Sequence, residues 1–265
     1  MNATLERSFE LFTQRISLNK QEVSEALERA TEICRFLRQA TQIQSCKITG
    51  SMAHSTAIRK YSDVDVAAVL YPLSLTENTP QSITAGLLTL LTRRYHTAAI
   101  SENTVRISFT KGPDVDVIPA IPASNKATYT IPSPDRKAWH TYDPERRNKE
   151  ITEKTAQLGV GFIRLIRIAK WWSGCNGQPL ASYEIEDAAS AAFTFPMPPT
   201  SFAIVDFFEH VRHLPKKLYD DQDATISSAR AIAEKALESE QQGDTQRALY
   251  YWGSLLGDQF PNFVP

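Results

Sequence analysis

The sequence has few cysteines, and their pattern excludes two kinds of stabilised module. Three cysteines occur in 265 residues, at Cys34, Cys46 and Cys175, and none belongs to a CxxC pair. An odd number of widely spaced cysteines without that motif argues against a disulfide framework and against a zinc module. We therefore expect reduced cysteines, with Cys46 as a small buried apolar group, and a reducing compartment, most simply the cytoplasm.

Long apolar runs are also missing. No stretch approaches the roughly 18 uninterrupted apolar residues that a membrane-spanning helix needs. The first residues, MNATLERSFELFTQR, carry charges early and lack the apolar segment of a secretory signal peptide. The sequence thus predicts neither a membrane span nor an export signal, and we expect no membrane partner.

Charge of one sign is not in excess. Lysine and arginine number 29 against 30 aspartates and glutamates, which gives a net charge of -1. Proteins that coat nucleic acid without sequence preference need a surplus of positive charge, and so do polybasic membrane-binding proteins. Nucleic acid is therefore not the expected partner. A local basic groove stays open, because one stretch concentrates cations: Arg146, Arg147, Lys149, Lys154, Arg164, Arg167 and Lys170.

The order of apolar patterns predicts an α+β protein. Residues 4–44 have helical spacing, and the texture then changes to alternating, strand-like segments with a fully apolar stretch after Asp65. Residues 119–145 are rich in Pro, Ser and Asp and predict a long irregular passage, and the chain is helical again from about 148. The expected strands cover residues 45–49, 63–70, 104–109 and 114–118, the last of them stopped by Pro119.

Two pairs of aspartates lie at strand starts. Asp63 and Asp65 are two residues apart, so in a strand both side chains face the same way, and Asp114 and Asp116 repeat this spacing. Neighbouring carboxylates repel unless a cation lies between them, and hard oxygen ligands suit Mg²⁺. A third carboxylate on a neighbouring strand would complete a two-metal site. A single DxD pair is more often only a solvated strand end.

The Gly50-Ser51 pair supplies the second half of the pattern. A glycine lets a backbone approach a phosphate closely, and the following serine adds a hydroxyl and N–H donors. Alone this dipeptide is weaker still as a signal. The order of strand, Gly-Ser turn, carboxylate pair, apolar strand and second carboxylate pair is what points to nucleotidyl transfer.

This pattern resembles the polymerase-β-type nucleotidyltransferase superfamily, and within it the cGAS/DncV-like nucleotidyltransferases of bacteria. The resemblance covers roughly residues 20–215. The family often has a glycine directly before Thr56, where this chain has Ser55. The matching segments are Gly50-Ser51, Thr56–Arg59, Ser62–Val66, Asp116–Ala120, Tyr129–Pro132, Trp139, Tyr142–Pro144, Arg164–Arg167, Lys170–Trp172 and Ser182–Glu186.

The resemblance implies an architecture and a metal site. It implies a polymerase-β-like lobe with a mixed sheet flanked by helices, in residues 1–145 with the N-terminal helices, packed on a helical nucleotide-binding lobe in residues 146–265. Asp63, Asp65 and Asp116 would be the catalytic and metal-binding triad. The family's third aspartate directly precedes a Val-Ile-Pro-Ala-like stretch, which selects Asp116 over Asp114.

The resemblance also implies the nucleotide-binding groups. Gly50 and Ser51 would hold the triphosphate, and Lys170 would reach the phosphates as a point charge. Ser182 and Tyr183 would lie near the donor nucleotide, where Tyr183 could stack on the base. Two Mg²⁺ ions, or Mn²⁺ in their place, are the implied cofactors.

The implied activity is the joining of nucleoside triphosphates into a cyclic di- or oligonucleotide second messenger, with release of pyrophosphate. ATP, and with it GTP or pyrimidine triphosphates, would be the substrates, in bacterial anti-phage signalling with a regulatory protein partner left open. Alternatives with the same core remain: nucleotide addition to an RNA end, modification of a small hydroxyl acceptor, and an inactive nucleotide-sensing module. The near-neutral charge favours free nucleotides over a polymer.

Overall fold

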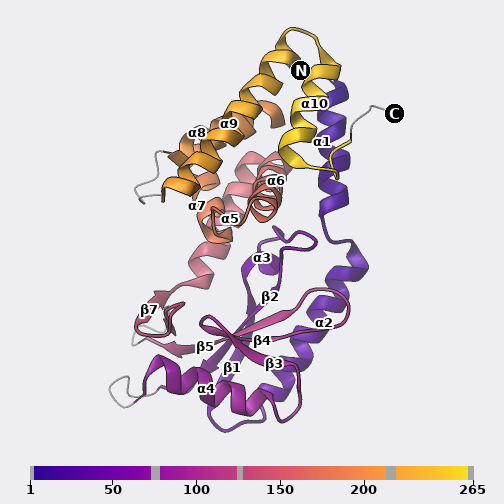
Figure 1. Cartoon of the computed structure of the whole chain (residues 1–265). Coiled ribbons are helices and arrows are strands. Elements are labelled where there is room, and N and C mark those ends of the chain that lie inside the picture. Colours follow the sequence, from indigo (N-terminus) through magenta and orange to yellow (C-terminus); the bar gives the residue numbers. More distant parts are fainter. Residues whose placement is uncertain (1–2, 73–77, 124–127, 213–218, 262–265) are drawn as a thin grey trace. The chain divides into compact units, whose positions relative to one another are not determined.

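A computed structural model describes residues 3–72, 78–123, 128–212 and 219–261. Contacts between elements divide the chain into two compact units. Leu18–Lys149 form what we call the sheet unit, and Met1–Ser17 together with Glu150–Pro265 form the helical unit (Figure 1). Each unit is described by itself below.

The sheet unit is built on a mixed sheet, as the sequence predicts. In the described residues its seven strands include a path ordered β1-β2-β5-β4-β3, while β6 pairs with β5 and β7. The β2–β5 pair is parallel and the other pairs are antiparallel. The elements are β1 Ile43–Thr49, β2 Val64–Leu70, β3 Ala98–Ser101, β4 Thr104–Ile107, β5 Val115–Pro122, β6 Tyr129–Pro132, β7 Trp139–Tyr142, α2 Lys20–Leu37, α3 Gly50–Ala53 and α4 Pro80–Leu91.

The alternation along β2 assigns its side chains to two different cores. Val64, Val66 and Ala68 pack in one cluster with apolar residues of α2 and α4, the purple helices beside the sheet in Figure 1. Ala67 and Val69 belong to a separate cluster on the opposite face. Because side chains alternate along a strand, an aspartate at position 65 shares the face of the second, smaller cluster.

The passage after position 119 is more ordered than the sequence predicts. The expectation of a long irregular segment was wrong, since β5 continues to Pro122 and is followed by β6 and β7, with residues 124–127 outside the described part. Pro119 does not stop β5. It lies between the part of β5 that pairs with β4 (115–117) and the part that pairs with β6 (121–122), so its missing N–H breaks neither ladder.

The expectation that all three cysteines are reduced was also wrong. Cys34 on α2 and Cys46 on β1 form a disulfide, with 5.4 Å between their Cα atoms, and both are buried. Cys175 takes no part in this disulfide and is exposed. The pairing depends on α2 packing against β1, which cysteine spacing does not reveal. The disulfide removes the support that the cysteine pattern gave to a reducing compartment, although Cys46 is buried as predicted.

The helical unit has an aromatic core to which the N-terminal helix contributes. Phe9 and Phe12 of α1 pack edge-on against Trp252, Phe260 and Trp171, at centroid distances of 5.1–6.2 Å. The unit contains α1 Ala3–Ile16, most of α5 Pro144–Leu158, and α6 Val160–Cys175, α7 Ser182–Ala192, α8 Thr200–Arg212, α9 Asp220–Gln241 and α10 Thr245–Leu256.

This assignment of α1 differs from the division expected from the sequence, which keeps both N-terminal helices with the sheet. Only α2 belongs to the sheet unit, since Ala26, Ala30 and Ile33 pack in the sheet's core. Among the described residues, no helix has both the length and the apolarity that a membrane crossing requires.

Candidate active site

Three carboxylates gather at the start of two neighbouring parallel strands. Asp65 is the second residue of β2 and Asp116 the second of β5, and the two are direct partners in the parallel register. Asp63 directly precedes β2. The parity of both strands directs Asp65 and Asp116 to the face opposite the α2–α4 core. The structure thus brings together the three aspartates that the sequence selects.

Arg106, a residue that sequence reasoning missed, binds two of these carboxylates. It lies on β4 directly opposite Asp116. Its Nε donates to Asp116 Oδ1 at 2.9 Å, and its Nη2 donates to Asp116 Oδ2 at 2.7 Å and to Asp63 Oδ2 at 2.6 Å. The hydrogen bond to Asp116 raises the pKa of the guanidinium, which is charged in any case. The alternation of Thr104, Arg106 and Ser108 indicates that these side chains share one face of a strand. Only the register of β4 against β5 shows that Arg106 lies opposite Asp116.

The Asp63 carboxyl has a raised pKa. Burial is the main cause, and the negative charges of Asp116 and Asp114 add to it, while Arg106 acts in the opposite direction. Burial thus disfavours the ionised form of Asp63, and a cation bound to this carboxyl would favour it. This is the electrostatic signature of a place that favours an additional cation.

Gly50 is required where it stands because of the neighbouring Asp65. It directly follows β1, whose last residue Thr49 pairs with Asp65, and it has a positive φ of 66°. A Cβ at this position would overlap the Asp65 carboxylate. Both the backbone conformation and the close approach therefore demand glycine. Ser51 follows on the short helix α3 and is 9% exposed.

The donor chemistry of this cluster fits a divalent cation. Asp63, Asp65 and Asp116 supply hard oxygen ligands from one sheet face, as Mg²⁺ prefers. One cationic nitrogen of Arg106 already lies within 2.7 Å of oxygens from two of them, which shows that the pair accommodates a positive charge. In the described residues, no set of three or more His, Cys, Asp and Glu side chains is arranged to hold a metal ion.

Comparison with known proteins decides the family. A family model described as "Second Messenger Oligonucleotide or Dinucleotide Synthetase domain" (SMODS) matches residues 3–155, more than half of the chain. The protein belongs to the SMODS family. The match includes Gly50, Ser51 and all three aspartates of the site.

A curated relative of this SMODS protein is the "Probable cyclic nucleotide synthase" of Bacillus cereus (strain VD146). It is 24% identical over 171 residues, which cover 56% of this chain and 51% of the relative. The aligned region thus spans about half the length of the relative.

Solved structures share the fold over nearly the whole chain. CdnC of E. coli MS115-1, in a complex with HORMA-deltaN, matches with a TM-score of 0.80 at 16% identity, covering 97% of this chain and 98% of that one. CdnG of Bradyrhizobium diazoefficiens, in complex with GTP, gives 0.78 at 11% identity, covering 98% and 96%. DncV of Vibrio cholerae, a cyclic AMP-GMP synthase, gives 0.60 at 13%, covering 97% and 88%. The expected cGAS/DncV-like resemblance and fold are confirmed.

The position where this SMODS chain departs from the family pattern has a left-handed backbone. Ser55 has a φ of 58°, a conformation that glycine adopts without steric cost. The turn nevertheless closes, with Thr56 N donating to Ser51 O at 2.9 Å. The serine therefore adopts the glycine-like geometry, and the path of the Gly50-Ser51 turn is kept.

Two further groups lie near the carboxylates, and one of them is held by hydrogen bonds of a turn. Asp114 closes the β4–β5 turn, because its two oxygens accept hydrogen bonds from Phe109 N (3.0 Å) and Ser108 Oγ (3.1 Å). On the other side, burial is the main cause that raises the pKa of Tyr142, and the charge of Asp65 raises it further. Asp114 is thus tied to its turn, whereas Tyr142 lies beside the site.

A hollow of about 420 Å³ opens beside Asp63, within the sheet unit. Its lining includes Arg59 and Lys60. Arg59 is held by Glu22, which accepts from Nε on both oxygens (3.1 Å each) and from Nη2 at 2.9 Å. Glu22 also accepts from Asn19 N, so the ion pair is joined to the N-terminal cap of α2. Arg59 thus ties the loop before β2 to the start of α2.

The other predicted nucleotide-binding residues lie in the helical unit. Ser182 and Tyr183 are the first two residues of α7, and Tyr183 is 55% exposed. Lys170 on α6 is buried, and its Nζ donates to Glu186 Oε1 on α7 at 2.7 Å. The structure thus brings these three to neighbouring parts of α6 and α7, and places the triad in the sheet unit.

The stretch of cations between residues 146 and 170, which suggested a possible RNA-binding groove, forms contacts within the helical unit at four of its seven positions. Lys154 Nζ donates to Phe193 O at 2.8 Å, Arg164 pairs with Glu6, and Arg167 donates to Ser17 Oγ at 3.1 Å. Together with Lys170, four of the seven cations therefore hold other parts of their own unit. This pattern disfavours a basic groove built from that stretch.

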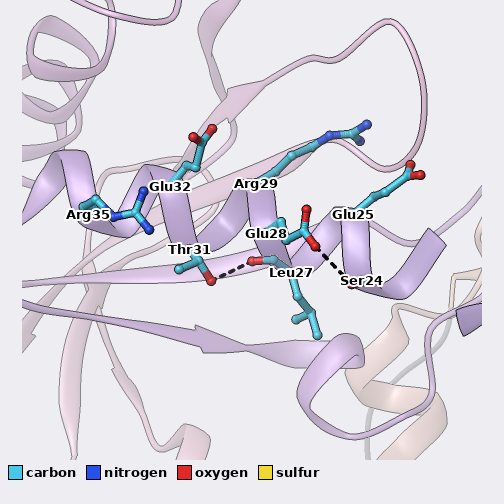
Figure 2. A pocket seen from close by; sticks show the side chains of 8 residues that line it. All are labelled: Ser24, Glu25, Leu27, Glu28, Arg29, Thr31, Glu32 and Arg35. Carbon is cyan, nitrogen blue, oxygen red and sulfur yellow. Dashed lines mark hydrogen bonds between the residues drawn. The ribbon is translucent and has the colours of Figure 1, made fainter. Parts of the chain in front are cut away.

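Figure 2 shows a separate hollow of about 660 Å³ on α2. Its lining carries both signs of charge, and neighbouring residues satisfy part of its polar groups: Thr31 Oγ1 donates to Leu27 O at 2.7 Å and Ser24 Oγ to Glu28 Oε1 at 3.2 Å. Nothing in this surface selects one kind of ligand. It is lined by Ser24, Glu25, Leu27, Glu28, Arg29, Thr31, Glu32 and Arg35.

Proposed function

We propose that this protein is a metal-dependent nucleotidyltransferase that joins nucleoside triphosphates into a cyclic di- or oligonucleotide second messenger. The observation that carries the proposal is the convergence of Asp63, Asp65 and Asp116 on one face of β2 and β5, next to the Gly50-Ser51 turn. Membership of the SMODS family supports the same reaction. The relative from Bacillus cereus named as a cyclic nucleotide synthase supports it further.

In the proposed reaction, a ribose 2′- or 3′-hydroxyl of one nucleotide attacks the α-phosphorus of another. A new O–P bond forms, the bond between the α-phosphorus and the bridging oxygen breaks, and pyrophosphate leaves. Asp116 is the residue to which we assign acceptance of the hydroxyl proton. A second transfer of the same kind within the linear product closes the ring.

Asp63, Asp65 and Asp116 would hold the divalent cations, Mg²⁺ or Mn²⁺, two in number in the full complex. Cations bound there supply positive charge that stabilises the attacking and leaving oxygens. Gly50 and Ser51 bind the triphosphate of the donor through backbone and hydroxyl groups. The close contact of Gly50 with Asp65 supports this proposal, because the Gly50-Ser51 turn then lies beside one of the proposed ligands.

Ser182 and Tyr183 of α7 bind the donor nucleotide, with Tyr183 stacking on the base. Lys170, whose Nζ donates to Glu186 Oε1, is the residue to which we assign contact with a phosphate as a point charge. ATP and GTP are the first substrates to test, because solved relatives contain them: CdnC with ATP and CdnG with GTP. A role in anti-phage signalling in the cytoplasm, under the control of a protein partner, completes the proposal. The CdnC complex with HORMA-deltaN supports the last point.

The test is product analysis with the full chain. The protein is incubated with Mg²⁺ or Mn²⁺ and each of the four ribonucleoside triphosphates, singly and mixed, with and without extract of phage-infected cells. Products are separated by anion exchange and weighed by mass spectrometry. We expect a cyclic product with one phosphate per nucleotide and release of one pyrophosphate per bond.

Two aspartate variants make the assay specific. Asp116→Asn should abolish the product, whereas Asp114→Asn, two residues earlier and tied to its turn, should retain it. Loss of activity in Asp114→Asn with activity kept in Asp116→Asn would contradict the assignment. Absence of product in every mixture, or a product formed only when RNA is added, would contradict the proposed reaction.

A further inference from the structure

Arg106 occupies the position where a divalent cation would bind Asp63 and Asp116. Its guanidinium donates hydrogen bonds to both oxygens of Asp116. A single nitrogen, Nη2, lies between Asp116 Oδ2 at 2.7 Å and Asp63 Oδ2 at 2.6 Å. The pairing is fixed by the sheet, because Arg106 and Asp116 are register partners on adjacent antiparallel strands. The contact is therefore a feature of the fold's register.

A cation and this guanidinium compete for the same oxygens. Mg²⁺ binds carboxylate oxygens at about 2.0–2.1 Å and demands near-octahedral geometry. A guanidinium does not lose its proton in a protein, so it leaves only by moving. The Arg106 side chain is 37% exposed, whereas that of Asp116 is 13% exposed, so the arginine is the partner with solvent to move into.

We infer that Arg106 is a positioning residue that acts as a built-in substitute cation: it pairs Asp63 with Asp116 before metal binds and has to release them for the metal to enter. This inference rests on the proposed function. The reason for such a device is electrostatic, since clustered carboxylates repel without a cation between them. Metal affinity is therefore set by exchange of one cation for another, with loading coupled to displacement of the arginine.

The inference predicts that removal of Arg106 strengthens metal binding, whereas a merely supporting role predicts the opposite change. If Arg106 only oriented the ligands, its removal would weaken metal binding, since loss of groups that orient ligands typically costs about 10–100-fold in affinity. If Arg106 competes with the metal, Arg106→Gln should bind Mn²⁺ about 10-fold or more tightly than the wild type. Arg106→Lys keeps the charge but loses the fork, and should lie between the two.

The experiment measures Mn²⁺ binding to the full chain without nucleotide, by electron paramagnetic resonance of free Mn²⁺ and by calorimetry. Arg93→Gln is the matched control, because Arg93 is an exposed arginine just after α4 in the same unit. It should bind like the wild type, and Asp116→Asn should bind more weakly. Melting temperatures with and without Mn²⁺ add a second readout, in which Arg106→Gln should be less stable without metal and gain more from it.

Unchanged or weaker Mn²⁺ binding in both Arg106 variants would overturn the inference, and so would absence of binding in the wild type and both variants. If Arg106→Gln does not fold, the direction of the change in Mn²⁺ affinity is taken from Arg106→Lys alone. The product assay of the wild type decides the proposed function separately. A wild type that makes the cyclic product while Arg106→Gln binds no more tightly contradicts only the role of Arg106.

Discussion

Two clusters of charged side chains, one in each unit, show how similar ion pairs serve different ends. In the helical unit, Lys170 and Glu186 form a pair whose side chains are 3% and 4% exposed. In the sheet unit, Arg106 faces Asp63 and Asp116, with side chains that are 37%, 35% and 13% exposed. The first is a buried pair with equal charges of opposite sign, and the second is a half-exposed cluster with more negative than positive charge.

The difference lies in what each cluster still requires. In the buried Lys170–Glu186 pair the two charges compensate each other, and removal of one partner would leave the other charge buried without this counter-ion. Asp63 and Asp116, with Asp65 and Asp114 close by, outnumber the one arginine that pairs with them, so this cluster has more negative than positive charge. Surplus charge near solvent is a means of attracting a cation, whereas balanced charge in a core holds two helices together.

The largest expected effect is on activity, at the unbalanced cluster. Asp116→Asn removes one charge and one oxygen ligand while keeping the shape of the side chain. Loss of a group that only orients a metal ligand lowers metal affinity or activity by about 10–100-fold, so loss of a ligand itself should lower turnover by more than about 100-fold. Thermal stability should stay near that of the wild type. Turnover within a few-fold of the wild type would show that Asp116 is not part of the triad.

The next effect is on stability, at the balanced pair. Lys170→Met leaves Glu186 buried without its cation and should lower the free energy of unfolding by about 3–5 kcal/mol. The double variant Lys170→Met/Glu186→Leu should recover most of that loss, as measured by urea denaturation. If the double variant is stable but binds nucleotide more weakly, Lys170 also serves the nucleotide. A double variant as unstable as the single one would contradict the view of the pair as self-contained.

Gly50→Ala tests the geometry that brings the Gly-Ser turn against Asp65. A side chain at a positive φ costs about 1–3 kcal/mol, and the added Cβ displaces the Asp65 carboxylate. Both the free energy of unfolding and the turnover should fall. The control is Gly86→Ala in α4, where a Cβ meets nothing within 4 Å, and it should be neutral or slightly stabilising. Equal behaviour of the two variants would refute a special role for Gly50.

The smallest effect concerns a balanced pair near solvent, Glu22 with Arg59. The hydrogen bond from Arg59 lowers the pKa of Glu22, so the pair stabilises the fold above the unfolded-state pKa of glutamate and loses this contribution as pH falls through the lower folded-state value. Glu22→Gln keeps the helix cap and should cost less than about 1 kcal/mol at neutral pH. Its stability should also depend less on pH in the acid range. Glu25→Gln, an exposed site on the same helix, should leave the wild-type pH profile unchanged.

Local pattern was enough to predict which aspartates of the candidate site lie close together. The two-residue spacing of Asp63 and Asp65 fixed a common face, and the family pattern after Asp116 selected it over Asp114, which the structure places in a turn. The partners of these residues could not be predicted. Arg106 reaches Asp116 only because β4 pairs with β5 in one register. Pro119 remains in a strand because it pairs with Ala68 of β2 and falls between the β4 and β6 ladders on the other edge.

The sequence by itself determined the class of the fold and the strand at the DxD pair, because these depend on periodicity and short-range spacing. The resemblance of its motifs to known proteins indicated the family. Tertiary structure alone decided the Cys34–Cys46 bond, the place of α1 among the C-terminal helices, and the capture of two aspartates by Arg106. Each of these joins residues through packing or strand register. Contacts of that kind depend on how elements pack together, and the spacing of residues along the chain does not set them.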